Sequence, residues 1–443
     1  MSERTTLVGQ TYALCPVCLK RLRSRRVRRE DGVWLERDCP EHGRFSALVW
    51  RDLRDFATWT RGAQRIGKDG NENCPQDCGL CGSHIRDTCC ILLEVAKGCD
   101  LGTCRFCFAD QRGGQPEPTL AQIEGWIGEL VRPGKTLLQL SGGEPAIRDD
   151  LPQIVRAARA AGCKYVQLNT NGLRLAEDEE FVRQLAEAGL SFVFMQFDGT
   201  DDAVYENLRG RPLLAVKERA IECCARHGLG VTLVPTVVRG VNESQLGDIL
   251  RFAVARAPAV RGVHFQPVCY LGRTPGGDPP MERYTLDELM RDLGEQTHDL
   301  LNGVELRPSC CDHPLCGFHG DFVVLENDRL HHLNRTAPVA AGSDCCCADP
   351  AERNREFVGR RWQRRPASAV RRAGGDIEDM DYFLERVRSH AFTITAMAFQ
   401  DAGNLDLERL RSCSLHVYRE GRTIPFCANY LTPQPVSDER KDA

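Results

Sequence analysis

The sequence predicts an α/β protein whose centre is a partial (β/α)6, TIM-like barrel, with an N-terminal metal knuckle and a C-terminal cysteine-rich α+β extension. Three observations predict this fold. Six short apolar segments alternate with helical patterns between residues 90 and 301. Such near-continuous apolar runs are typical of parallel strands that are covered on both faces. The 23 cysteines gather in tight groups, most of them outside that region.

Five segments are expected along the chain. They are a zinc-ribbon or rubredoxin-like metal module at residues 1–60, a cysteine-rich auxiliary-cluster segment at 61–89, the barrel at 90–301, an auxiliary-cluster and substrate domain at 302–432, and a disordered tail at 433–443. A chain of 443 residues is long enough for two or three domains with a substantial core.

The first segment carries metal-ligand residue types on two short arms. Cys15 and Cys18 form a Cys-x2-Cys pair, and Cys39 and His42 form a Cys-x2-His pair. A pair of ligands on each arm closes a tetrahedron, as in zinc ribbons and rubredoxin knuckles. The segment is too small to bury a core of its own, so metal binding is expected to supply its folding free energy. The residues leave zinc and a single iron both open.

A basic run, 20-KRLRSRRVRR-29, lies between these arms and leads to a hairpin turn predicted at Asp31–Gly32. One interpretation is a patch for nucleic acid or another anionic partner. The other is a solvated hairpin arm, which we favour because no aromatic residues interleave the charges.

The barrel strands are expected at residues 90–96, 136–140, 165–170, 192–198, 231–238 and 262–268. Helices fit between them, and two of these begin with the spacing of a capping box, at Thr119 with Gln122 and at Thr285 with Glu288. Six βα units joined by right-handed crossovers make most of a barrel but not the full eight units.

Polar residues follow every one of these strands. They are the cysteine loop 99–107 after the first strand, Gly142–Pro145 after the second, Asn169–Gly172 after the third, Gln196–Gly199 after the fourth, Arg239 after the fifth and Gln266–Pro267 at the end of the sixth. Because the carboxyl ends of parallel strands share one edge, where barrel active sites lie, the sequence predicts an active site there. Cys99, Cys104 and Cys107 are its central candidates, since three thiolates can hold three irons of a four-iron cluster and leave the fourth iron open.

The loop 99-CDLGTCRFC-107 and the segment 142-GGEP-145 resemble the signature of the radical S-adenosylmethionine (SAM) superfamily. The resemblance implies that Cys99, Cys104 and Cys107 hold a [4Fe–4S] cluster whose free iron chelates SAM. It also implies that one electron splits SAM into methionine and a 5′-deoxyadenosyl radical, which abstracts a hydrogen atom from an unactivated C–H bond. The cluster supplies the chemistry, and the protein supplies orientation and the exclusion of water.

The same resemblance implies a set of SAM contacts. Phe106 matches the aromatic position beside the adenine. The other matches are Gly142, Gly143, Glu144 and Pro145 for the amino group, and Asn169, Asn171 and Asp198 for the ribose and the carboxylate.

One spacing departs from the family pattern. The superfamily usually shows Cys-x3-Cys-x2-Cys, whereas four residues separate Cys99 from Cys104, and 74-CPQDCGLC-81 has the usual spacing. Spacing alone would therefore select Cys74, Cys78 and Cys81. Position selects the 99–107 loop instead, because this loop follows a strand, carries Phe106 and precedes GGEP by one βα unit.

Further pieces extend the resemblance over nearly the whole chain. The segments 34-WLERDCPEHGRF-45, 167-QLNTNG-172 and 423-TIPFCANYLTP-433 resemble the branch that contains the tetraether lipid synthases (Tes) and the cobalamin-independent methylases that act on a pterin. Within it, 317-GFHGDFVVLEN-327 and 345-CCC-347 look closest to the TrsS group. The branch implies one or two auxiliary iron–sulfur clusters and a mononuclear site at the N-terminus.

Two cysteine groups are candidates for auxiliary clusters. Cys74, Cys78 and Cys81 form one group, with Cys89 or Cys90 as a fourth ligand; Cys310, Cys311, Cys316, Cys413 and Cys427 form the other. The run 345-CCC-347 leaves three interpretations open: redox-active or substrate-binding thiols, cluster ligands, or an ordinary loop. The eight arginines between 353 and 372 suit a site for an anionic head group or, as we favour, a solvated helix.

These observations predict a radical SAM enzyme for methylation or C–C bond formation, with methylation favoured. We expect a small-molecule, lipid or pterin-like substrate, an electron donor such as ferredoxin or flavodoxin, and leave a partner methyltransferase open. The alternatives are a multi-cluster electron-transfer protein, which would have no use for the polar strand ends, and a zinc-ribbon nucleic-acid-binding protein, which only the basic run supports.

Composition excludes several other classes. The net charge is 58 − 62 = −4, so no global basic field favours nucleic acid. No run approaches 18 apolar residues, and the N-terminus lacks the apolar core of a signal peptide. The sequence therefore predicts a cytoplasmic protein without a transmembrane segment.

Overall fold

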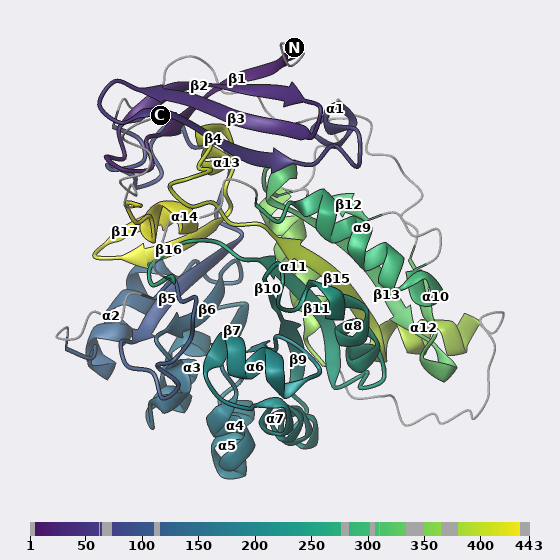
Figure 1. Cartoon of the computed structure of the whole chain (residues 1–443). Coiled ribbons are helices and arrows are strands. Elements are labelled where there is room, and N and C mark those ends of the chain that lie inside the picture. The colour runs from purple at the N-terminus through teal and green to yellow at the C-terminus, as the bar shows by residue number, and fades with distance from the viewer. Residues whose placement is uncertain are drawn as a thin grey trace.

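Two β-sheets organise the chain (Figure 1). A four-stranded antiparallel sheet comes first, and a thirteen-stranded sheet holds all the other described strands. The computed structural model describes residues 5–61, 63, 73–109, 116–275, 283–301, 306–309, 311–333, 350–364 and 380–434. Cys310, the 345–347 run, the arginines after 364 and residues 435–443 of the predicted tail lie outside the described residues.

The N-terminal sheet consists of β1 (Thr6–Leu14), β2 (Arg21–Arg29), β3 (Gly32–Cys39) and β4 (Gly43–Trp50), paired in that order. The hairpin turn predicted at Asp31–Gly32 is confirmed. Gly32 has φ +142°, and a Cβ at this position would overlap the Trp50 carbonyl oxygen. The short helix α1 (Phe56–Trp59) follows, and its Trp59 ring lies 5.6 Å from that of Trp50.

The basic run on β2 attaches this sheet to the C-terminal part of the chain. Arg26 is buried, and its guanidinium contacts Asp406 at 2.6 Å and Glu408 at 3.1 Å. Asp406 precedes helix α13 (Leu407–Arg411), which lies against the N-terminal sheet in Figure 1. The solvated arm that we favoured therefore does not describe Arg26, because the opposing carboxylates come from a segment 380 positions away.

Eight parallel strands form the centre of the second sheet. In spatial order they are β16 (Leu415–Arg419), β5 (Cys90–Ala96), β6 (Leu137–Gly142), β7 (Tyr165–Thr170), β8 (Phe192–Gln196), β9 (Gly230–Val234), β11 (Val260–Pro267) and β15 (Ala391–Met397). Five further strands complete the sheet: β10 (Thr236–Val237) beside β11, β12 (Arg307–Pro308), β13 (Gly317–Val324) and β14 (Leu330–His332) beyond β15, and β17 (Arg422–Pro425) beyond β16.

The predicted α/β fold with a partial barrel is confirmed, and each of the six predicted strands is present. The C-terminal extension adds something that the sequence pattern did not show. Its strands β15 and β16 join opposite edges of the parallel sheet instead of forming a separate unit. No ladder connects the two outer edges among the described strands, so the sheet remains open.

Helices cover the outer face of this sheet (Figure 1). They are α2 (Leu120–Leu130), α3 (Leu151–Ala160), α4 (Leu173–Glu177), α5 (Glu179–Glu187), α6 (Asp202–Arg209), α7 (Leu214–Arg226), α8 (Leu246–Val254), α9 (Leu286–Gln296) and α10 (His298–Leu301). Later helices are α11 (Pro350–Trp362), α12 (Met380–Ser389) and α14 (Phe426–Asn429). Both predicted capping boxes are present, and no helix within the described residues is long and apolar enough to cross a membrane.

Alternation along the strands separates an apolar core from a polar cavity. On β7, Val166 and Leu168 belong to the core between the sheet and its helices, whereas Gln167 and Asn169 line the cavity on the other face. Successive side chains of a strand point to opposite faces. A strand that looks continuously buried therefore presents amides to the inside of the curved sheet.

Candidate active site

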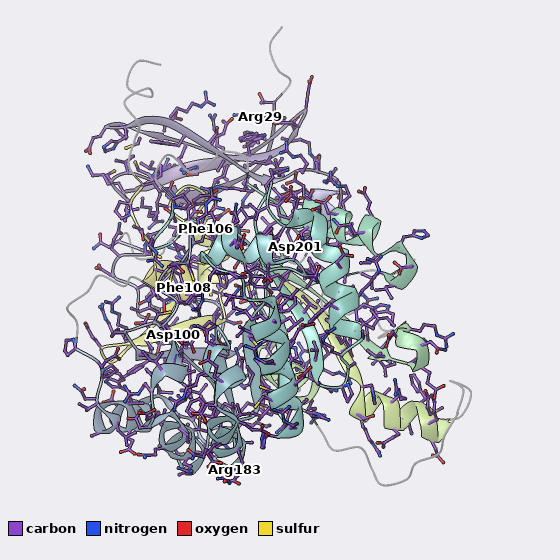
Figure 2. All side chains as sticks on the ribbon, turned by 60° about the horizontal axis from the view of Figure 1, so that its bottom comes forward. Arg29, Asp100, Phe106, Phe108, Arg183 and Asp201 are labelled. Atoms are coloured by element: carbon purple, nitrogen blue, oxygen red, sulfur yellow. The ribbon has the colours of Figure 1, made fainter. Side chains whose placement is uncertain are left out.

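The cysteine loop after β5 is fixed by backbone contacts with two other segments. The Arg105 N–H donates to the Leu208 carbonyl at 2.9 Å, which ties the loop to α6. Cys107 and Arg273 exchange two backbone hydrogen bonds of 3.0 and 2.8 Å. Figure 2 labels Asp100, Phe106 and the adjacent Phe108 below the sheet that carries Arg29; Asp100 is exposed, and the two phenylalanines are half-buried.

The three thiols of the loop share one cavity. Cys99, Cys104 and Cys107 all line a cavity of about 330 Å³. Burial raises the pKa of Cys99 and of Cys107, and the neighbouring Cys104 thiol raises the pKa of Cys107 further. A positive cluster that replaces the three protons relieves this cost, since thiolates are the form that binds iron. Three thiols around one open space fit a [4Fe–4S] cluster with an iron position left for a further ligand.

The glycine pair after β6 lies directly on the start of this loop. The Gly143 N–H donates to the Ala96 carbonyl at 2.8 Å, and the Glu144 N–H donates to the Gly98 carbonyl at 2.8 Å. A Cβ on Gly142 would overlap the Ala96 carbonyl oxygen, and a Cβ on Gly143 would overlap that of Gly98. Gly142 also has φ +135°, which other residues rarely adopt. The close approach of these two backbones explains why both positions are glycine.

The Glu144 carboxylate connects the end of β6 to the end of β7 through hydrogen bonds. It is buried and accepts hydrogen bonds from the Thr170 hydroxyl at 2.6 Å, the Asn171 N–H at 2.6 Å and the Ala146 N–H at 3.0 Å. Burial raises the pKa of Glu144 to about 7. The Asn171 side-chain amide in turn donates to Asp100 at 2.7 Å, so one chain of contacts runs from β6 through β7 to the cysteine loop. Pro145 begins a short 3-10 helix, Pro145–Ile147, immediately after Glu144.

Asp198 after β8 is fully buried, and its carboxylate forms an ion pair with Arg209. The Arg209 guanidinium donates to both carboxylate oxygens at 2.6 and 2.9 Å, and the Thr236 N–H donates to one of them at 3.0 Å. Arg209, rather than Asp198, lines the cavity and lies beside Cys104. The structure thus places a cation between the cysteine loop and the predicted Asp198 position.

Lys217 of α7 is a second buried cation in this region. Its ammonium group donates to the Asn171 carbonyl and, at 2.8 Å, to the Gln196 side-chain oxygen. Burial lowers the pKa of Lys217 to about 8. Both acceptors belong to residues that line the cavity, so Lys217 holds the ends of β7 and β8 in place from behind.

The interior of the sheet continues the cavity away from the cysteine loop. The Gln167 amide donates to the Asn169 side-chain oxygen at 2.6 Å, and its own side-chain oxygen is buried without a hydrogen-bond partner within the described residues. His264 of β11 bonds to Thr395 at 2.8 Å and lies 5.1 Å from the Phe194 ring. Burial lowers the pKa of His264 to about 3, so its imidazole is neutral. Amides, a neutral imidazole and aromatic rings recognise a planar, uncharged heterocycle.

The remaining SAM-contact candidates lie at the same cavity. Phe106, Asn169 and Asn171 line it together with Gly142, Gly143 and Glu144, whereas Pro145 and Asp198 do not. The Phe106 ring meets Tyr270 edge to face, with 5.9 Å between ring centroids.

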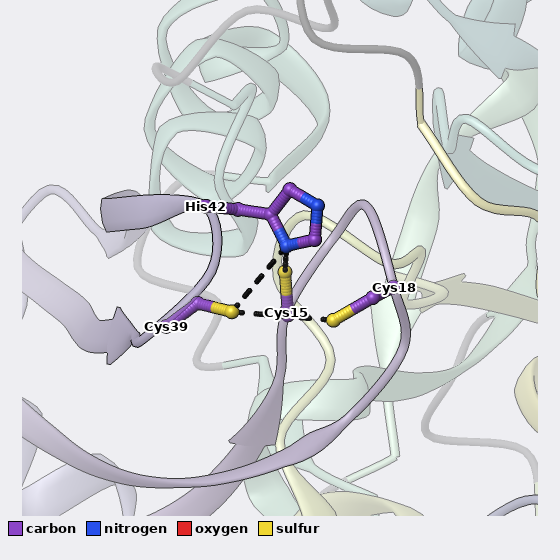
Figure 3. Close-up of side chains that lie close together, drawn as sticks. All are labelled: Cys15, Cys18, Cys39 and His42. Atoms are coloured by element: carbon purple, nitrogen blue, oxygen red, sulfur yellow. Dashed lines mark hydrogen bonds between the residues drawn. The ribbon is translucent and has the colours of Figure 1, made fainter. Parts of the chain in front are cut away.

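The four predicted ligands of the N-terminal knuckle meet at one point (Figure 3). Their ligand atoms all lie within 4.8 Å of one another, and His42 Nδ1 is 3.7 Å from Cys15 Sγ and 3.5 Å from Cys39 Sγ. Burial raises the pKa of Cys15 to about 12. Burial acts the same way on Cys39, but hydrogen bonds from the Glu41 backbone amide and from His42 outweigh it and lower the pKa of Cys39 to about 7. Three thiols and one imidazole at this separation suit a tetrahedral metal ion.

The other cysteines named as cluster candidates fall into two sets of three, together with Cys89, Cys90 and Cys311. Cys74, Cys78 and Cys81 are near enough for their charges to interact. A second such set holds Cys316, Cys413 and Cys427. Cys311, predicted as part of this second set, lies instead near Cys89, and each of these two thiols affects the pKa of the other. Cys90 accepts a hydrogen bond from Gln139 at 3.3 Å and faces the cavity.

Three residues at the site carried no signal in the sequence. Arg209 and Lys217 lie in amphipathic helices, where a basic residue is usually solvated, and His264 lies inside an apolar strand. Only the strand-end position of Gln196 and Asp198 pointed to this region. Their buried cationic partners could have been found by asking what neutralises a carboxylate at a buried strand end.

The fold and the cysteine ligands together define an iron–sulfur enzyme, and sequence comparison identifies the superfamily to which it belongs. The profile described as the radical SAM superfamily matches residues 93–253, and the profile described as the HMPTM N-terminal zinc ribbon domain matches residues 7–51. The chain belongs to the radical SAM superfamily. It is an enzyme whose cofactors are a [4Fe–4S] cluster and SAM, with a zinc ribbon at its N-terminus.

One relative matches almost end to end. The 7,8-dihydro-6-hydroxymethylpterin dimethyltransferase of Methanocaldococcus jannaschii is 30% identical over 483 residues, covering 97% of this chain and 95% of that protein. The probable GTP 3′,8-cyclase of Methanococcus aeolicus is 28% identical over 192 residues, covering 42% of this chain and 62% of that protein. Among solved structures, Streptococcus suis SuiB bound to its precursor peptide SuiA is 15% identical, with 49% of this chain and 47% of that chain covered and a TM-score of 0.38. The predicted resemblance to the pterin-methylase branch is confirmed by the first of these matches.

Proposed function

We propose that this enzyme generates a 5′-deoxyadenosyl radical from SAM and uses it to abstract a hydrogen atom from an unactivated C–H bond of a pterin-like substrate, leading to methylation. The observation that carries the proposal is one cavity that holds both the three loop thiols and a layer of amides and neutral aromatic groups. The near end-to-end similarity to a pterin dimethyltransferase supports the substrate class. C–C bond formation by the same radical is the second outcome that this cavity allows.

The chain's own residues hold and shield the reactants. Cys99, Cys104 and Cys107 would hold the cluster, which supplies the electron that cleaves SAM. The backbone of Gly142 and Gly143 offers a surface without side chains next to that loop, suited to the amino group of SAM. The Glu144 oxygens are already satisfied by three donors, so we assign the carboxylate a positioning role.

Arg209 and Asn171 extend this assignment. Arg209 presents a guanidinium beside Cys104 and is held by Asp198, which makes it the cation best placed for a carboxylate such as that of SAM. Asn171 and Asn169 face the cavity from the end of β7 and suit the ribose hydroxyls. Phe106 completes the wall on the adenine side.

Substrate recognition falls to the far part of the cavity. Gln139, Gln167 and His264 line it, and the unpaired Gln167 side-chain oxygen can accept a hydrogen bond from a ring N–H or an amino group. Phe194 and Trp362 provide flat apolar surface, with their rings 5.2 Å apart. This lining favours a pterin-like ring over a lipid chain, because an alkyl chain would leave the buried amides without partners.

Further metal sites and partners complete the proposal. We assign Cys15, Cys18, Cys39 and His42 to the zinc ion, and the sets Cys74/Cys78/Cys81 and Cys316/Cys413/Cys427 to auxiliary iron–sulfur clusters. A ferredoxin or flavodoxin would supply the electron, in a reducing cytoplasm where these thiols stay available for metals.

The decisive experiment compares two cysteine variants. After anaerobic reconstitution, wild type and Cys78→Ala are expected to form 5′-deoxyadenosine on reduction with SAM, whereas Cys104→Ala forms none. Iron analysis is expected to give clearly more than the content of one four-iron cluster per chain. If Cys104→Ala retained the SAM-bound cluster signal while Cys78→Ala lost it, the assignment of the loop would be wrong. Formation of a methylated product from 7,8-dihydro-6-hydroxymethylpterin would establish the substrate class. If this compound never increased deoxyadenosine formation, the proposed substrate class would be wrong.

A further inference from the structure

Two buried thiols meet at the wall of the cavity, outside every metal set assigned above. Cys89 is 4% exposed and Cys311 1% exposed, and the two thiols are close enough for each to affect the pKa of the other. The segments that carry them both hydrogen bond to Ser414. Cys89 lines the cavity. The pair joins a residue just before β5 to a residue just before β13, which are far apart in the sequence.

Both thiols are held by polar neighbours. Cys89 Sγ accepts a hydrogen bond from the Asn354 amide at 3.3 Å, and its backbone N–H donates to the Ser414 carbonyl at 2.9 Å. Cys311 donates its S–H to Asp312 Oδ2 at 3.2 Å. The other oxygen of Asp312 accepts hydrogen bonds from the Ser414 N–H and hydroxyl at 2.7 and 2.9 Å. This arrangement gives the Cys311 proton a fixed acceptor.

The pair lies at the opposite end of the cavity from the cysteine triad. Cys90 begins β5 and Ala96 ends it, and the six residue-to-residue steps between them span about 20 Å. SAM held at the triad would leave the part of the cavity next to Cys89 for the substrate. Among the described residues, only the zinc-ribbon ligands and the group Glu179, Cys223 and His227 bring three or more ligand atoms within 4.8 Å, so this thiol pair is not a ready mononuclear metal site.

We propose that Cys89 is a hydrogen-atom donor to a substrate carbon radical formed in this cavity, and that Cys311 completes the oxidation of the pair to a disulfide. The inference rests on the proposed function, because it requires a substrate radical. A thiol S–H bond is weaker than an ordinary C–H bond, so a carbon radical takes its hydrogen atom readily. The buried site also keeps other hydrogen donors away from the radical.

The Cys89 S–H bond breaks, a substrate C–H bond forms, and an unpaired electron remains on Cys89 sulfur. Cys311 passes its proton to Asp312 and bonds to that sulfur, and the surplus electron leaves to an oxidised one-electron carrier of the iron–sulfur or flavin class. The pair has then lost one hydrogen atom, one proton and one electron and has become a disulfide, which a dithiol reductant returns to two thiols.

Deuterium transfer tests the proposal. Anaerobic holoenzyme is given SAM, reduced flavodoxin and 7,8-dihydro-6-hydroxymethylpterin in D₂O, where thiol hydrogens exchange for deuterium. Wild-type product is expected to carry one carbon-bound deuterium, and the ratio of labelled product to deoxyadenosine is expected to fall roughly tenfold or more in Cys89→Ala. Cys163→Ala, which removes a core thiol from the helix side of the sheet, is expected to keep the wild-type ratio. A merely structural loss would lower product and deoxyadenosine together and leave the ratio unchanged.

Disulfide mapping provides a second test of the proposal that needs no substrate. Treatment of the anaerobic holoenzyme with the thiol oxidant diamide, followed by acid quench and peptide mass spectrometry, is expected to link the peptides of Cys89 and Cys311. A link from Cys89 to Cys90 or to the 345–347 run instead, or an unchanged deuterium ratio in Cys89→Ala, would overturn the proposal. If no deoxyadenosine forms at all, the proposed function fails, and the mapping alone decides whether the pair exists.

Discussion

The metal site of the N-terminal ribbon and the cysteine loop after β5 differ in how many donors meet and in what surrounds them. The ribbon brings four ligand atoms within 4.8 Å of one another. The loop offers three thiols around a cavity of about 330 Å³. A filled coordination shell can only stabilise structure, whereas a missing ligand beside an open space leaves room for chemistry. The same residue type thus serves both purposes, and the number of donors that converge decides which.

The two regions also differ in what fixes them. The ribbon's ligands lie at the end of β3 and in the connections β1–β2 and β3–β4 of its own four-stranded sheet, which is anchored to the rest of the chain by Arg26. The loop depends on contacts from β6, α6 and the segment at Arg273, which come from three other parts of the chain. Changes at the ribbon should therefore act mainly on stability and metal content, and changes at the loop mainly on SAM cleavage.

Loss of a metal ligand in the N-terminal ribbon is expected to have the largest effect on stability. Cys39→Ser should remove one zinc per chain, because a structural zinc site contributes on the order of 10 kcal/mol of binding free energy that is coupled to folding. Metal analysis and limited proteolysis within residues 6–50 would show the change. Cys163→Ser, which alters a core thiol away from both sites, is the matched control. If the variant kept its zinc, the assigned ligand set would be wrong.

Loss of the Arg26 ion pairs that attach the ribbon to the rest of the chain is expected to have the second-largest effect on stability. Arg26→Met removes the partner of buried Asp406 and Glu408 and is expected to lower the free energy of unfolding by about 3–5 kcal/mol. Arg25→Met serves as the control, because Arg25 is 54% exposed and its contact with Glu36 is 3.6 Å long, whereas Arg29 and Arg44 stay paired with Glu36 at 2.6 and 2.8 Å. Its loss should cost about 1 kcal/mol or less. Chemical denaturation measures both. Equal effects of the two substitutions would show that the N-terminal sheet is not anchored at this point.

Local patterns predicted the central strands and the position of the site, because each strand is an apolar run with polar residues at its end. They could not show that β15 and β16 extend the same sheet. Leu415 pairs with Cys90 across more than three hundred residues, and such a pairing depends on the whole fold. The same limit applies at the site: the partner of Asp198 is Arg209, which sits on the helix that follows the strand. The grouping of Cys311 with Cys89 likewise joins two loops that only the folded sheet brings together.

The open site contains a buried carboxylate whose charge should make stability depend on pH. Burial raises the pKa of Glu144 from 4.5 to about 7, so the folded state binds a proton more tightly than the unfolded state does. Stability linked to Glu144 is therefore fully present below about pH 4.5 and is lost as the pH rises through 7, by at most about 3 kcal/mol. Denaturation of cluster-free Glu144→Gln between pH 5 and 8 is expected to show a flatter profile than wild type. A profile parallel to that of wild type would mean that Glu144 keeps its charge in the fold.

A substitution in the Gly142–Gly143 pair is expected to affect the cysteine loop 99–107 and to leave the N-terminal ribbon unchanged. Gly143→Ala would place a Cβ on the Gly98 carbonyl oxygen, so the start of the cysteine loop must shift away from β6. A displacement of about 1 Å at a catalytic group can reduce the rate roughly a hundredfold, which is about 2.7 kcal/mol of barrier. Gly128→Ala is the matched control, because a Cβ there meets no atom within 4 Å on helix α2, where alanine also favours the helix. The measurement is deoxyadenosine formation at saturating SAM, together with zinc content. If Gly143→Ala lost zinc as well as activity, the loop and the ribbon would be coupled, and the separation of a structural from a catalytic cysteine site would not hold for this enzyme.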